Sequence, residues 1–488
     1  MREWLPTVSD VPGPPPVAPR APALGAAELA RITGGTLLRT SARPARGGAV
    51  DSRKVEPGNI FFALPGERTD GHRFLAAAVQ AGAAALVVTR QPDPLVLAGL
   101  GDVSVVLVPA GLPALQALAA DWRARFSPVV IGITGSYAKT SAKEAIATVV
   151  ETRFRTLKSP GNENNEIGLP LALLRLEPDD EVAVLELGMY VRGDIAALAA
   201  LARPRIGVVT AIGGVHLERA GSLAAIEEEK GRLVEALPGD GLAVLNADDR
   251  AVRRLAARSP APVWTYGFAA DADVGAEEVK SLGGEGMRFV LRAAGRRTPV
   301  TTPALGRLGV HNALAGAAAG LGVGLAPAEI AAGLAAGFGA PHRTALLSAG
   351  PWLVLDDSYN ASPATVAAAL DLLASLPGRR VAVLGEMLEL GPTFADDHRT
   401  TGAAAAGVAA LLVTIGEGGR EMAAGALGAG LPPGALIEAA DADAALAALL
   451  PRLAPGDVIL VKGSRGVALD RLVDRLTELG RAPAGTPS

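Results

Sequence analysis

Short apolar runs recur along the chain, and polar, Gly-containing or Ala-rich segments separate them. Short apolar runs between turn residues predict buried strands, and the longer segments between them predict helices. Strands that alternate with helices form parallel, doubly wound sheets. The pattern therefore predicts an α/β protein with strands at residues 60–64, 84–88, 103–108, 129–133, 182–187, 207–211, 242–246, 352–355, 380–384, 410–415 and 458–461.

Interruptions of this alternation of predicted strands and helices divide the chain into a tail and three tandem α/β domains. Residues 1–24 are rich in Pro and Ala, which predicts a flexible tail. The predicted domains are residues 25–126, 127–343 and 344–488, and a chain of 488 residues suits about three domains. The central domain has a mostly parallel sheet of the phosphate-loop type with a β excursion at 269–303, and the last domain is Rossmann-like.

Composition narrows the class of protein. Hydrophobic residues make up 49% of the chain and charged residues 20%, as in a globular protein. The net charge of −4 gives no electrostatic basis for a nucleic acid partner or an anionic membrane. The chain contains no Cys, so disulfides and thiolate catalysis are excluded. No signal peptide or membrane span is evident, and we expect a cytoplasmic protein without membrane insertion.

The segment that starts at Gly132 (GITGSYAKTS) follows a predicted strand and precedes a predicted helix at 142–150. A strand, a Gly-containing turn, Lys-Thr and a helix form a phosphate-binding loop, in which Lys139 contacts phosphate and Thr140 binds Mg²⁺. Ile133 and Ala138 stand where the strict pattern has glycines. The methyl group of Ala138 either crowds the phosphates and strains a turn of positive φ, or costs little if φ is negative.

Lysine is scarce in this chain, since only seven of the 46 Lys and Arg residues are Lys. A retained Lys is expected where Arg cannot replace it, either on phosphate or as an amine that is modified. Lys230 lies in a Glu-rich run, and such runs are usually solvated helix faces. The scarcity of Lys favours a special role for Lys230 over that ordinary one.

Polar residues follow several predicted strands, at the end of a parallel sheet where ligands bind. Glu186 ends one strand and His216 follows another, so both suit Mg²⁺. A helix cap or a solvent-facing side chain would equally explain Glu186, and a helix cap or a packed side chain would explain His216. The side-chain amides of Asn164 and Asn165 either orient a substrate or only favour a turn. The ordinary interpretation of Asn312 is that it caps the N-terminus of a helix. The remaining candidates lie in the last part of the chain: Arg343 at the domain boundary, Asp357, Asn360, Lys462 and Ser464.

In their order along the chain, these segments resemble the Mur ligase family of ATP-dependent, amide-forming ligases with three α/β domains. The resemblance covers residues 25–475. It rests on motifs that start at Gly132 (GITGSYAKT), Gly161 (GNENNEIG), Glu186 (ELG), Asn246 (NADD), His311 (HNALA), Asp356 (DDSYNA) and Val461 (VKGSR).

The resemblance implies a role for each candidate residue. Nucleotide binding is implied for Gly135, Ser136, Lys139, Thr140, Ser141, Asn312, Arg343, Asp357 and Asn360. Metal binding is implied for Thr140, Glu186, His216 and a carbamylated Lys230. Catalysis is implied for Lys139, Lys230, His216 and Arg343. Substrate binding is implied for the uridine-diphosphate turn Asp51, Ser52 and Arg53, and for Asn164, Asn165, Lys462 and Ser464.

The resemblance also implies an activity. The motifs at Asp356 and Val461 favour the branch that adds D-alanyl-D-alanine to UDP-N-acetylmuramoyl-tripeptide in peptidoglycan precursor synthesis. The resemblance to that branch implies ATP and Mg²⁺ as cofactors and an acyl phosphate as the intermediate. It also implies that the protein is a monomer whose substrates are small molecules. Two alternatives remain: a related ligase with another amine acceptor, and a nucleotide-binding protein without ligase activity, which Ala138 motivates.

Overall fold

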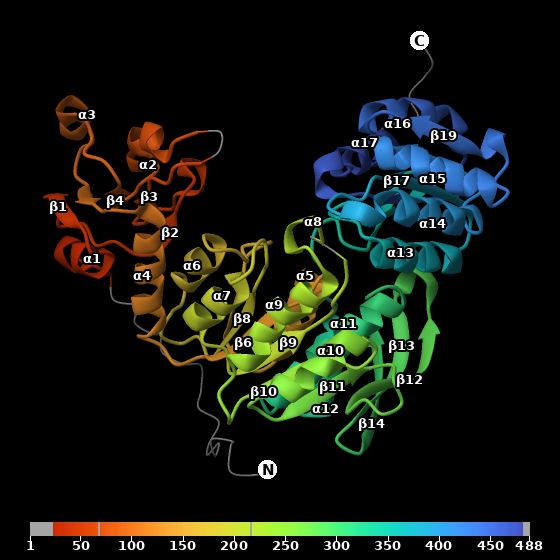
Figure 1. Cartoon of the computed structure of the whole chain (residues 1–488), viewed down its shortest axis with the longest axis horizontal. Helices are drawn as coiled ribbons and strands as arrows, with labels where there is room; N and C mark the ends of the chain where they lie inside the picture. The colour runs from red at the N-terminus through yellow and green to blue at the C-terminus, as the bar shows by residue number, and fades with distance from the viewer. Residues whose placement is uncertain (1–22, 67–68, 215–216, 482–488) are drawn as a thin grey trace.

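The computed structural model describes residues 23–66, 69–214 and 217–481, which form three α/β units, each built on its own sheet. The first unit and the last lie on either side of the central one (Figure 1). The predicted α/β class with three tandem units is confirmed, while the exact domain bounds stay predictions. In the described part of the chain, no helix has the length and apolar character needed to cross a membrane.

The first unit is a five-stranded sheet in the order β1-β5-β4-β3-β2, in which only β1 is antiparallel to its neighbour. Leu24 is buried and pairs with Ala45, so the end of the predicted tail belongs to this unit, and residues 1–22 lie outside the described residues. The elements are α1 (Ala26–Thr33), β1 (Thr36–Arg39), β2 (Gly48–Ala49), β3 (Ile60–Phe62), α2 (Leu75–Gln80), β4 (Ala85–Val88), α3 (Pro94–Gly99), β5 (Ser104–Leu107) and α4 (Gly111–Arg123).

The central unit is a nine-stranded sheet in the order β14-β13-β12-β11-β10-β9-β6-β8-β7. Strands β6 to β12 are parallel, and β13 and β14 continue the sheet as an antiparallel meander, which confirms the β excursion. The elements are β6 (Val129–Thr134), α5 (Lys139–Val150), β7 (Thr156–Lys158), α6 (Gly168–Leu173), β8 (Val182–Glu186), α7 (Asp194–Ala202), β9 (Ile206–Val209), α8 (Leu217–Ala220), α9 (Leu223–Glu235), β10 (Leu242–Asn246), α10 (Arg250–Arg254), β11 (Val263–Gly267), β12 (Val274–Ser281), β13 (Met287–Ala293), β14 (Arg296–Thr302), α11 (Gly306–Gly322) and α12 (Pro327–Ala336).

The last unit is a six-stranded sheet in the order β15-β16-β20-β17-β18-β19, parallel except for the edge strand β15. The elements are β15 (Ala345–Ala349), β16 (Trp352–Asp356), α13 (Pro363–Ser375), β17 (Arg379–Gly385), α14 (Phe394–Ala406), β18 (Leu411–Ile415), α15 (Glu417–Gly428), β19 (Leu436–Ala439), α16 (Ala442–Leu449), β20 (Asp457–Lys462) and α17 (Asp470–Arg481).

The register of the central sheet positions the functional residues. Strand β6 lies between β8 and β9, with Ile133 opposite Glu186 and Thr134 opposite Val209. The strands are parallel, so their carboxyl ends meet at one edge, where ligands of such sheets bind. The phosphate-binding loop and Glu186 therefore begin at the same edge of the sheet.

Two helices start earlier than the sequence predicts. Helix α5 begins at Lys139 rather than at residue 142, so the Lys and Thr of the loop form its first turn. Helix α11 begins at Gly306, which places the buried Asn312 within the helix. The ordinary interpretation of Asn312 as an N-cap is therefore wrong.

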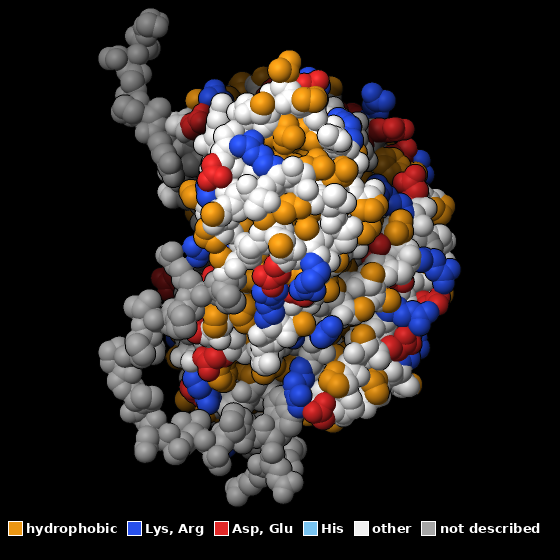
Figure 2. All heavy atoms as spheres, turned by 90° about the vertical axis from the view of Figure 1, so that its left-hand side faces the viewer, with side chains coloured by type: hydrophobic (Ala, Val, Ile, Leu, Met, Phe, Trp, Pro, Cys, Tyr) orange, Lys and Arg blue, Asp and Glu red, His pale blue; other side chains and the backbone are white. Residues whose placement is uncertain are grey.

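The face of the molecule on the side of the first unit carries charges of both signs. Figure 2 shows acidic and basic side chains interspersed with apolar ones on the described part of this face. No extensive surface of one sign is visible there, in keeping with the small net charge.

Candidate active site

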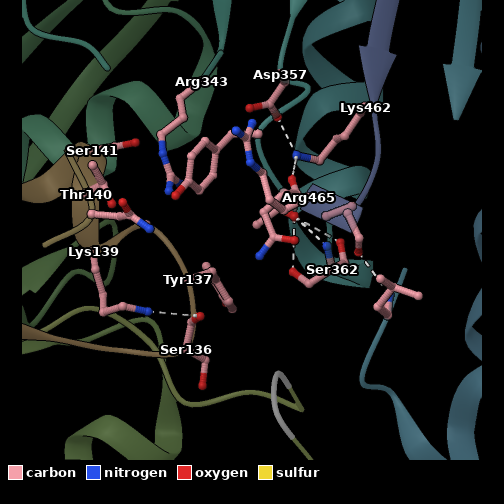
Figure 3. Close-up of a pocket in the computed structure, with 18 of the residues that line it drawn as sticks. Ser136, Tyr137, Lys139, Thr140, Ser141, Arg343, Asp357, Ser362, Lys462 and Arg465 are labelled. Atoms are coloured by element: carbon pink, nitrogen blue, oxygen red, sulfur yellow. Dashed lines mark hydrogen bonds and ion pairs between the residues drawn. The ribbon is translucent and has the colours of Figure 1, made fainter. Parts of the chain in front are cut away.

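A cavity of about 350 Å³ lies between the central and last units. One wall is the phosphate-binding loop, and the other is formed by the loops that follow β16, β17 and β20. Figure 3 shows Lys139, Thr140 and Ser141 on one side and Asp357, Lys462 and Arg465 on the other. Both walls consist of strand carboxyl ends, so the cavity has the position expected of a ligand site in α/β sheets.

The phosphate-binding loop is fixed on the end of β9. The hydroxyl of Thr210 donates to the carbonyl of Tyr137 at 2.6 Å, and the amide of Ser136 donates to the carbonyl of Ala211 at 2.7 Å. A Cβ on Gly135 would lie 1.9 Å from the Thr210 Oγ1. This close approach requires glycine at position 135.

Lys139 lies inside the loop with its ammonium group turned back on the backbone. Its Nζ donates to the carbonyl of Gly135 at 2.8 Å and lies 3.5 Å from the carbonyl oxygen of Ser136, the contact that Figure 3 draws. Burial lowers the pKa of Lys139, and the Arg343 guanidinium acts in the same direction, while the Glu186 carboxylate opposes them. The charges of these three residues therefore interact across the cavity.

Ala138 adopts a left-handed backbone conformation with φ of +63°. It directly precedes α5, at the position where the strict phosphate-loop pattern has glycine. The sequence leaves open whether φ at Ala138 is positive or negative, and the structure shows that it is positive. An L-residue with a Cβ is disfavoured in this region by about 1–2 kcal/mol.

Glu186 connects the loop to the Asn-rich segment. The Thr140 hydroxyl donates to its Oε2 at 2.8 Å, and the side-chain amide of Asn164 donates to its Oε1 at 2.7 Å. Glu186 is buried, so its interpretations as a helix cap and as a solvent-facing side chain are wrong. A hydroxyl and a carboxylate in contact form the hard oxygen donor set that Mg²⁺ prefers.

The predicted second metal ligand, His216, lies outside the described residues. Within the residues that the structure describes, no group of three or more His, Cys, Asp or Glu side chains is arranged to hold a metal ion. The predicted metal roles of Thr140, Glu186, His216 and Lys230 therefore stay predictions.

Lys230 is buried on α9, which excludes the solvated-face interpretation. The preceding Glu229 fixes this part of the helix, because its carboxylate accepts from the amides of Gly193 and Ile195, both at 2.9 Å. Burial, together with the positive charge of Lys139, lowers the pKa of Lys230 well below its usual value. The burial of Lys230 thus shifts its protonation equilibrium toward the neutral amine.

Asp357 and Lys462 join two distant motifs on the opposite wall. The Lys462 ammonium donates to Asp357 Oδ2 at 2.6 Å and to the carbonyl of Asn360 at 3.0 Å (Figure 3). The other carboxylate oxygen of Asp357 accepts from the amide of Thr344 at 3.1 Å. Lys462 is buried, so its charge is compensated by Asp357 in this conformation.

The hinge between the two units contains two non-glycine residues of positive φ, His342 at +60° and Thr344 at +52°. His342 Nδ1 lies 2.8 Å from Oδ2 of Asp356. Between them, Arg343 reaches the cavity, with its guanidinium carbon 4.1 Å from the centre of the Tyr359 ring. The hinge therefore directs Arg343 toward the phosphate-binding loop, as its predicted role requires.

Other predicted site residues lie away from this cavity. Asn165 accepts from the amides of Ile167 and Gly168 and so forms the turn that leads into α6. Asp51 pairs with Arg53 in the first unit, and the hydrogen bond from Arg53 lowers the pKa of Asp51 to about 2. The cavity lining does not include Ser52, Asn312 or Lys230.

The structure also adds cavity residues that the sequence interpretation missed: Tyr137, Tyr190, Tyr359, Ser362, Leu388, Glu389, Leu390 and Arg465. Tyr359 and Arg465 lie within the motifs at Asp356 and Val461, which could have indicated them. The Leu-Glu-Leu segment carries no such signal, since it only follows an apolar strand.

A cleft of this kind, with a phosphate-binding loop facing a second α/β unit, is typical of nucleotide-dependent enzymes that close around their substrates. Residues 47–123 match the family model "Mur ligase family, catalytic domain", residues 133–320 match "Mur ligase middle domain", and residues 342–465 match "Mur ligase, glutamate ligase domain". The chain belongs to the Mur ligase family.

Curated relatives and solved structures agree with this membership. The UDP-N-acetylmuramoyl-tripeptide–D-alanyl-D-alanine ligases of Bacillus subtilis and Escherichia coli are 35% and 37% identical, and each alignment covers 88% of this chain and 93% of the relative. A crystal structure of MurF from Acinetobacter baumannii superposes with a TM-score of 0.83 at 27% identity, covering 94% of this chain and all of that one. MurF ligase from Thermotoga maritima in complex with ADP gives 0.76 at 26% identity, covering 89% and 98%.

Proposed function

We propose that this protein is an ATP-dependent ligase that joins D-alanyl-D-alanine to the terminal carboxyl group of UDP-N-acetylmuramoyl-tripeptide in peptidoglycan precursor synthesis. The observation that carries the proposal is the cavity in which a phosphate-binding loop faces the strand ends of the last unit. The names of relatives at 35% and 37% identity support the same reaction.

ATP is the first substrate. The free amides at the start of α5 and the ammonium of Lys139 suit its phosphates, because a helix N-terminus favours anions. Lys139 would exchange the Gly135 carbonyl for the β- and γ-phosphates. Backbone and hydroxyl contacts come from Gly135, Ser136, Thr140 and Ser141, adenosine contacts from Asn312, Asp357 and Asn360, and a further phosphate contact from Arg343.

Thr140 and Glu186 would hold Mg²⁺, and bound there the ion neutralises phosphate charge. For the second predicted ion, His216 and Lys230 are the proposed ligands. A neutral Lys230 amine can add to carbon dioxide, which forms a C–N bond, releases one proton and leaves a carbamate. The carbamate would give this buried position an anionic oxygen donor, which Arg cannot provide.

The proposed reaction has two steps. An oxygen of the peptide carboxylate attacks the γ-phosphorus, the bond to the bridging oxygen breaks, and ADP leaves. The amine of the dipeptide then attacks the acyl carbon, loses a proton and expels inorganic phosphate. Arg343 and Lys139 stabilise charge on the phosphoryl group, and positioning supplies most of the remaining rate enhancement.

The other substrate contacts are proposed in the first unit, in the Asn-rich segment of the central unit and in the last unit. Asp51, Ser52 and Arg53 would bind the uridine diphosphate, while Asn164 and Asn165 would orient the sugar-peptide. Lys462 and Ser464 would face the incoming amine. The proposal also includes a monomer that acts in the cytoplasm on these small molecules.

Phosphate release tests this function. We expect release only when UDP-N-acetylmuramoyl-tripeptide, ATP, Mg²⁺ and D-alanyl-D-alanine are all present, with the product identified by mass spectrometry. Release that is indifferent to the dipeptide across a panel of amines would indicate a related ligase with another acceptor. ATP binding in calorimetry without any turnover would indicate a nucleotide-binding protein that is not a ligase.

A further inference from the structure

Lys143 is a buried lysine near the start of α5 that the proposed reaction does not use. Its Nζ donates to the carbonyl of Ser159 at 2.7 Å and to the carbonyl of Gly161 at 2.9 Å. The same nitrogen lies 3.1 Å from the carboxylate of Glu144. An ammonium group has three N–H donors, so each of them has an acceptor here. The side chain therefore connects the helix that carries the phosphate-binding residues to the segment that follows β7.

The surroundings of Lys143 explain why a lysine stands at this position in an arginine-rich chain. Three acceptors converge on one nitrogen atom, which a compact ammonium group matches and a planar guanidinium does not. Lys143 is fully buried, so the larger arginine side chain would have to displace its neighbours. The Glu144 carboxylate also accepts from Lys158 at 2.8 Å, and it thereby balances positive charge on both lysines. These contacts fix the position of the Lys143 ammonium group.

The segment at residues 159–164, which we call the 159–164 segment, contacts Glu186 at both of its ends. At its start, the hydroxyl of Ser159 accepts from the backbone amide of Glu186 at 3.2 Å. At its end, the side-chain amide of Asn164 donates to Glu186 Oε1 at 2.7 Å, and the carbonyl of Asn164 accepts from the amide of Gly188 at 2.7 Å. The approach is close, because a Cβ on Gly188 would lie 2.7 Å from Asn164 Oδ1. The position of the Glu186 carboxylate therefore depends on the position of this segment.

We propose that Lys143 is a positioning residue for the proposed magnesium site. It holds the 159–164 segment against α5, and the segment aligns the Glu186 carboxylate with the hydroxyl of Thr140. This inference rests on the proposed function, which supplies the ion and the nucleotide. Lys143 and Thr140 lie three positions apart on α5, and Thr140 donates to Glu186, so the contacts form a closed ring. Without the ammonium group, the segment loses two hydrogen bonds to the helix, and the ring opens.

Binding of a non-hydrolysable ATP analogue tests this role without catalysis. Lys143→Met keeps a long apolar side chain and removes the three donors. Calorimetry in the presence of Mg²⁺ should show about tenfold weaker binding of the analogue, because groups that orient a metal ligand usually contribute about 10- to 100-fold to metal affinity. Binding measured without Mg²⁺ should stay as in the unaltered protein. If binding weakens equally with and without Mg²⁺, Lys143 acts on the phosphates through its charge, and the inference is wrong.

Hydrogen exchange locates the effect in the chain. In Lys143→Met, the amides of Glu186 and Gly188 should exchange faster than in the unaltered protein, because their acceptors belong to the 159–164 segment. Arg123→Met is the matched control. Arg123 is a buried cation on α4 that also donates to two backbone carbonyls, at 3.1 Å and 2.8 Å. This control should leave the exchange of both amides and the Mg²⁺-dependent binding unchanged, even where it lowers the free energy of unfolding as much as Lys143→Met does.

Ser159→Ala decides the inference where Lys143→Met fails to fold. It removes only the acceptor of the Glu186 amide, and it should weaken Mg²⁺-dependent binding about 2- to 10-fold, the usual effect of one hydrogen bond. Unchanged Mg²⁺-dependent binding in Lys143→Met, or in Ser159→Ala where Lys143→Met does not fold, would overturn the inference. An equal loss in Arg123→Met would also overturn it.

The proposed function fails by a different result, the absence of any product from D-alanyl-D-alanine with the unaltered enzyme. Nucleotide binding and hydrogen exchange are measured without that dipeptide. The role of Lys143 is therefore decided whether or not the dipeptide is the acceptor.

Discussion

The hydroxyl of Thr140 donates a hydrogen bond of 2.8 Å to the carboxylate of Glu186, although the two residues are 46 positions apart in the chain. The contact exists because β6 and β8 are adjacent parallel strands whose carboxyl ends meet. It joins the phosphate-binding loop to the acidic end of the next strand. The pair is therefore the structural centre of the proposed magnesium site.

The first prediction concerns this pair. Thr140→Ala removes an oxygen donor and leaves Glu186 Oε2 without its hydroxyl partner. We expect kcat/KM for ATP to fall about 10- to 100-fold, because the loss of a group that binds or orients a metal ligand usually has an effect of this size. We also expect the variant to need a higher Mg²⁺ concentration for its half-maximal rate. Steady-state rates over a Mg²⁺ titration measure both effects. Thr140→Ser keeps the hydroxyl and should retain most of the activity; an equal loss in both variants would argue against the role of the hydroxyl.

The second prediction concerns Ala138, whose φ is +63°. Ala138→Gly relieves about 1–2 kcal/mol of strain in the folded state. It also makes the unfolded chain more flexible, at a cost of about 0.4–1 kcal/mol. We therefore expect the free energy of unfolding to stay equal or to rise by up to roughly 1.6 kcal/mol, with KM for ATP equal or lower.

Ala142→Gly is the control for Ala138→Gly. Ala142 lies within α5, where glycine costs about 1 kcal/mol and the lost buried methyl group about 0.8 kcal/mol more. Denaturant unfolding of the two variants should therefore shift in opposite directions, or shift for Ala142→Gly alone. If Ala138→Gly destabilises the protein as much as Ala142→Gly does, the left-handed strain at Ala138 is refuted.

The sequence predicts much of the central site because its residues lie next to apolar strands. The phosphate-binding loop and Glu186 each follow a recognisable strand, and the rule that parallel strands present their carboxyl ends together brings them close. The sequence leaves open whether Glu186 faces solvent, because burial depends on Thr140 and Asn164, which reach it from other segments.

The opposite wall was predicted less completely, because it is assembled from segments far apart. Lys462 and Asp357 are 105 positions apart, and no local pattern indicates that they pair. The segment at residues 388–390 has the sequence of an ordinary turn after a strand, and its place in the cavity wall depends on distant residues such as Ser464 and Arg219. The sequence does not show that Asn312 lies inside α11, because the residues at Gly306, where the helix begins, carry no strong helix-start signal.

The third prediction concerns Lys230. Burial keeps the pKa of its amine low, which favours the neutral form that reacts with carbon dioxide. Lys230→Ala should lose most activity, and bicarbonate or a short-chain carboxylic acid should partly restore it. Lys230→Arg should not be restored, because a guanidinium brings positive charge to the site. Enzyme supplied with ¹³C-bicarbonate should show a carbamate signal in NMR.

Lys280 provides the control for Lys230, since it is an exposed lysine on β12. Lys280→Ala should keep both the activity and the carbamate signal, and Lys230→Ala should lose both. Full activity of Lys230→Ala, or a carbamate signal that persists in it, would refute modification at this position.

The last prediction is a pH dependence carried by His398 on α14. Its Nε2 accepts from the amide of Met387, so only an imidazole with an unprotonated Nε2 holds the backbone just before the cavity residue Leu388. Burial lowers the pKa of His398 below its usual 6.5, although the carbonyl of Phe394 and the nearby carboxylates of Glu386, Asp397 and Glu421 oppose this effect.

The direction in which the free energy of unfolding changes with pH depends on whether the unfolded or the folded protein binds the proton first. On lowering the pH, the unfolded chain takes up a proton near 6.5 and the folded protein only at a lower pH, so the free energy of unfolding falls in that window. The slope reaches at most about 1.4 kcal/mol per pH unit for one proton. Denaturant unfolding measures the free energy of unfolding of the protein and of His398→Gln at pH values above and below this window. The difference between the two proteins isolates His398, because the other titrating groups contribute equally to both. His398→Gln keeps a side-chain acceptor for Met387 and should lose this part of the pH dependence; parallel curves for the two proteins would show that His398 does not carry it.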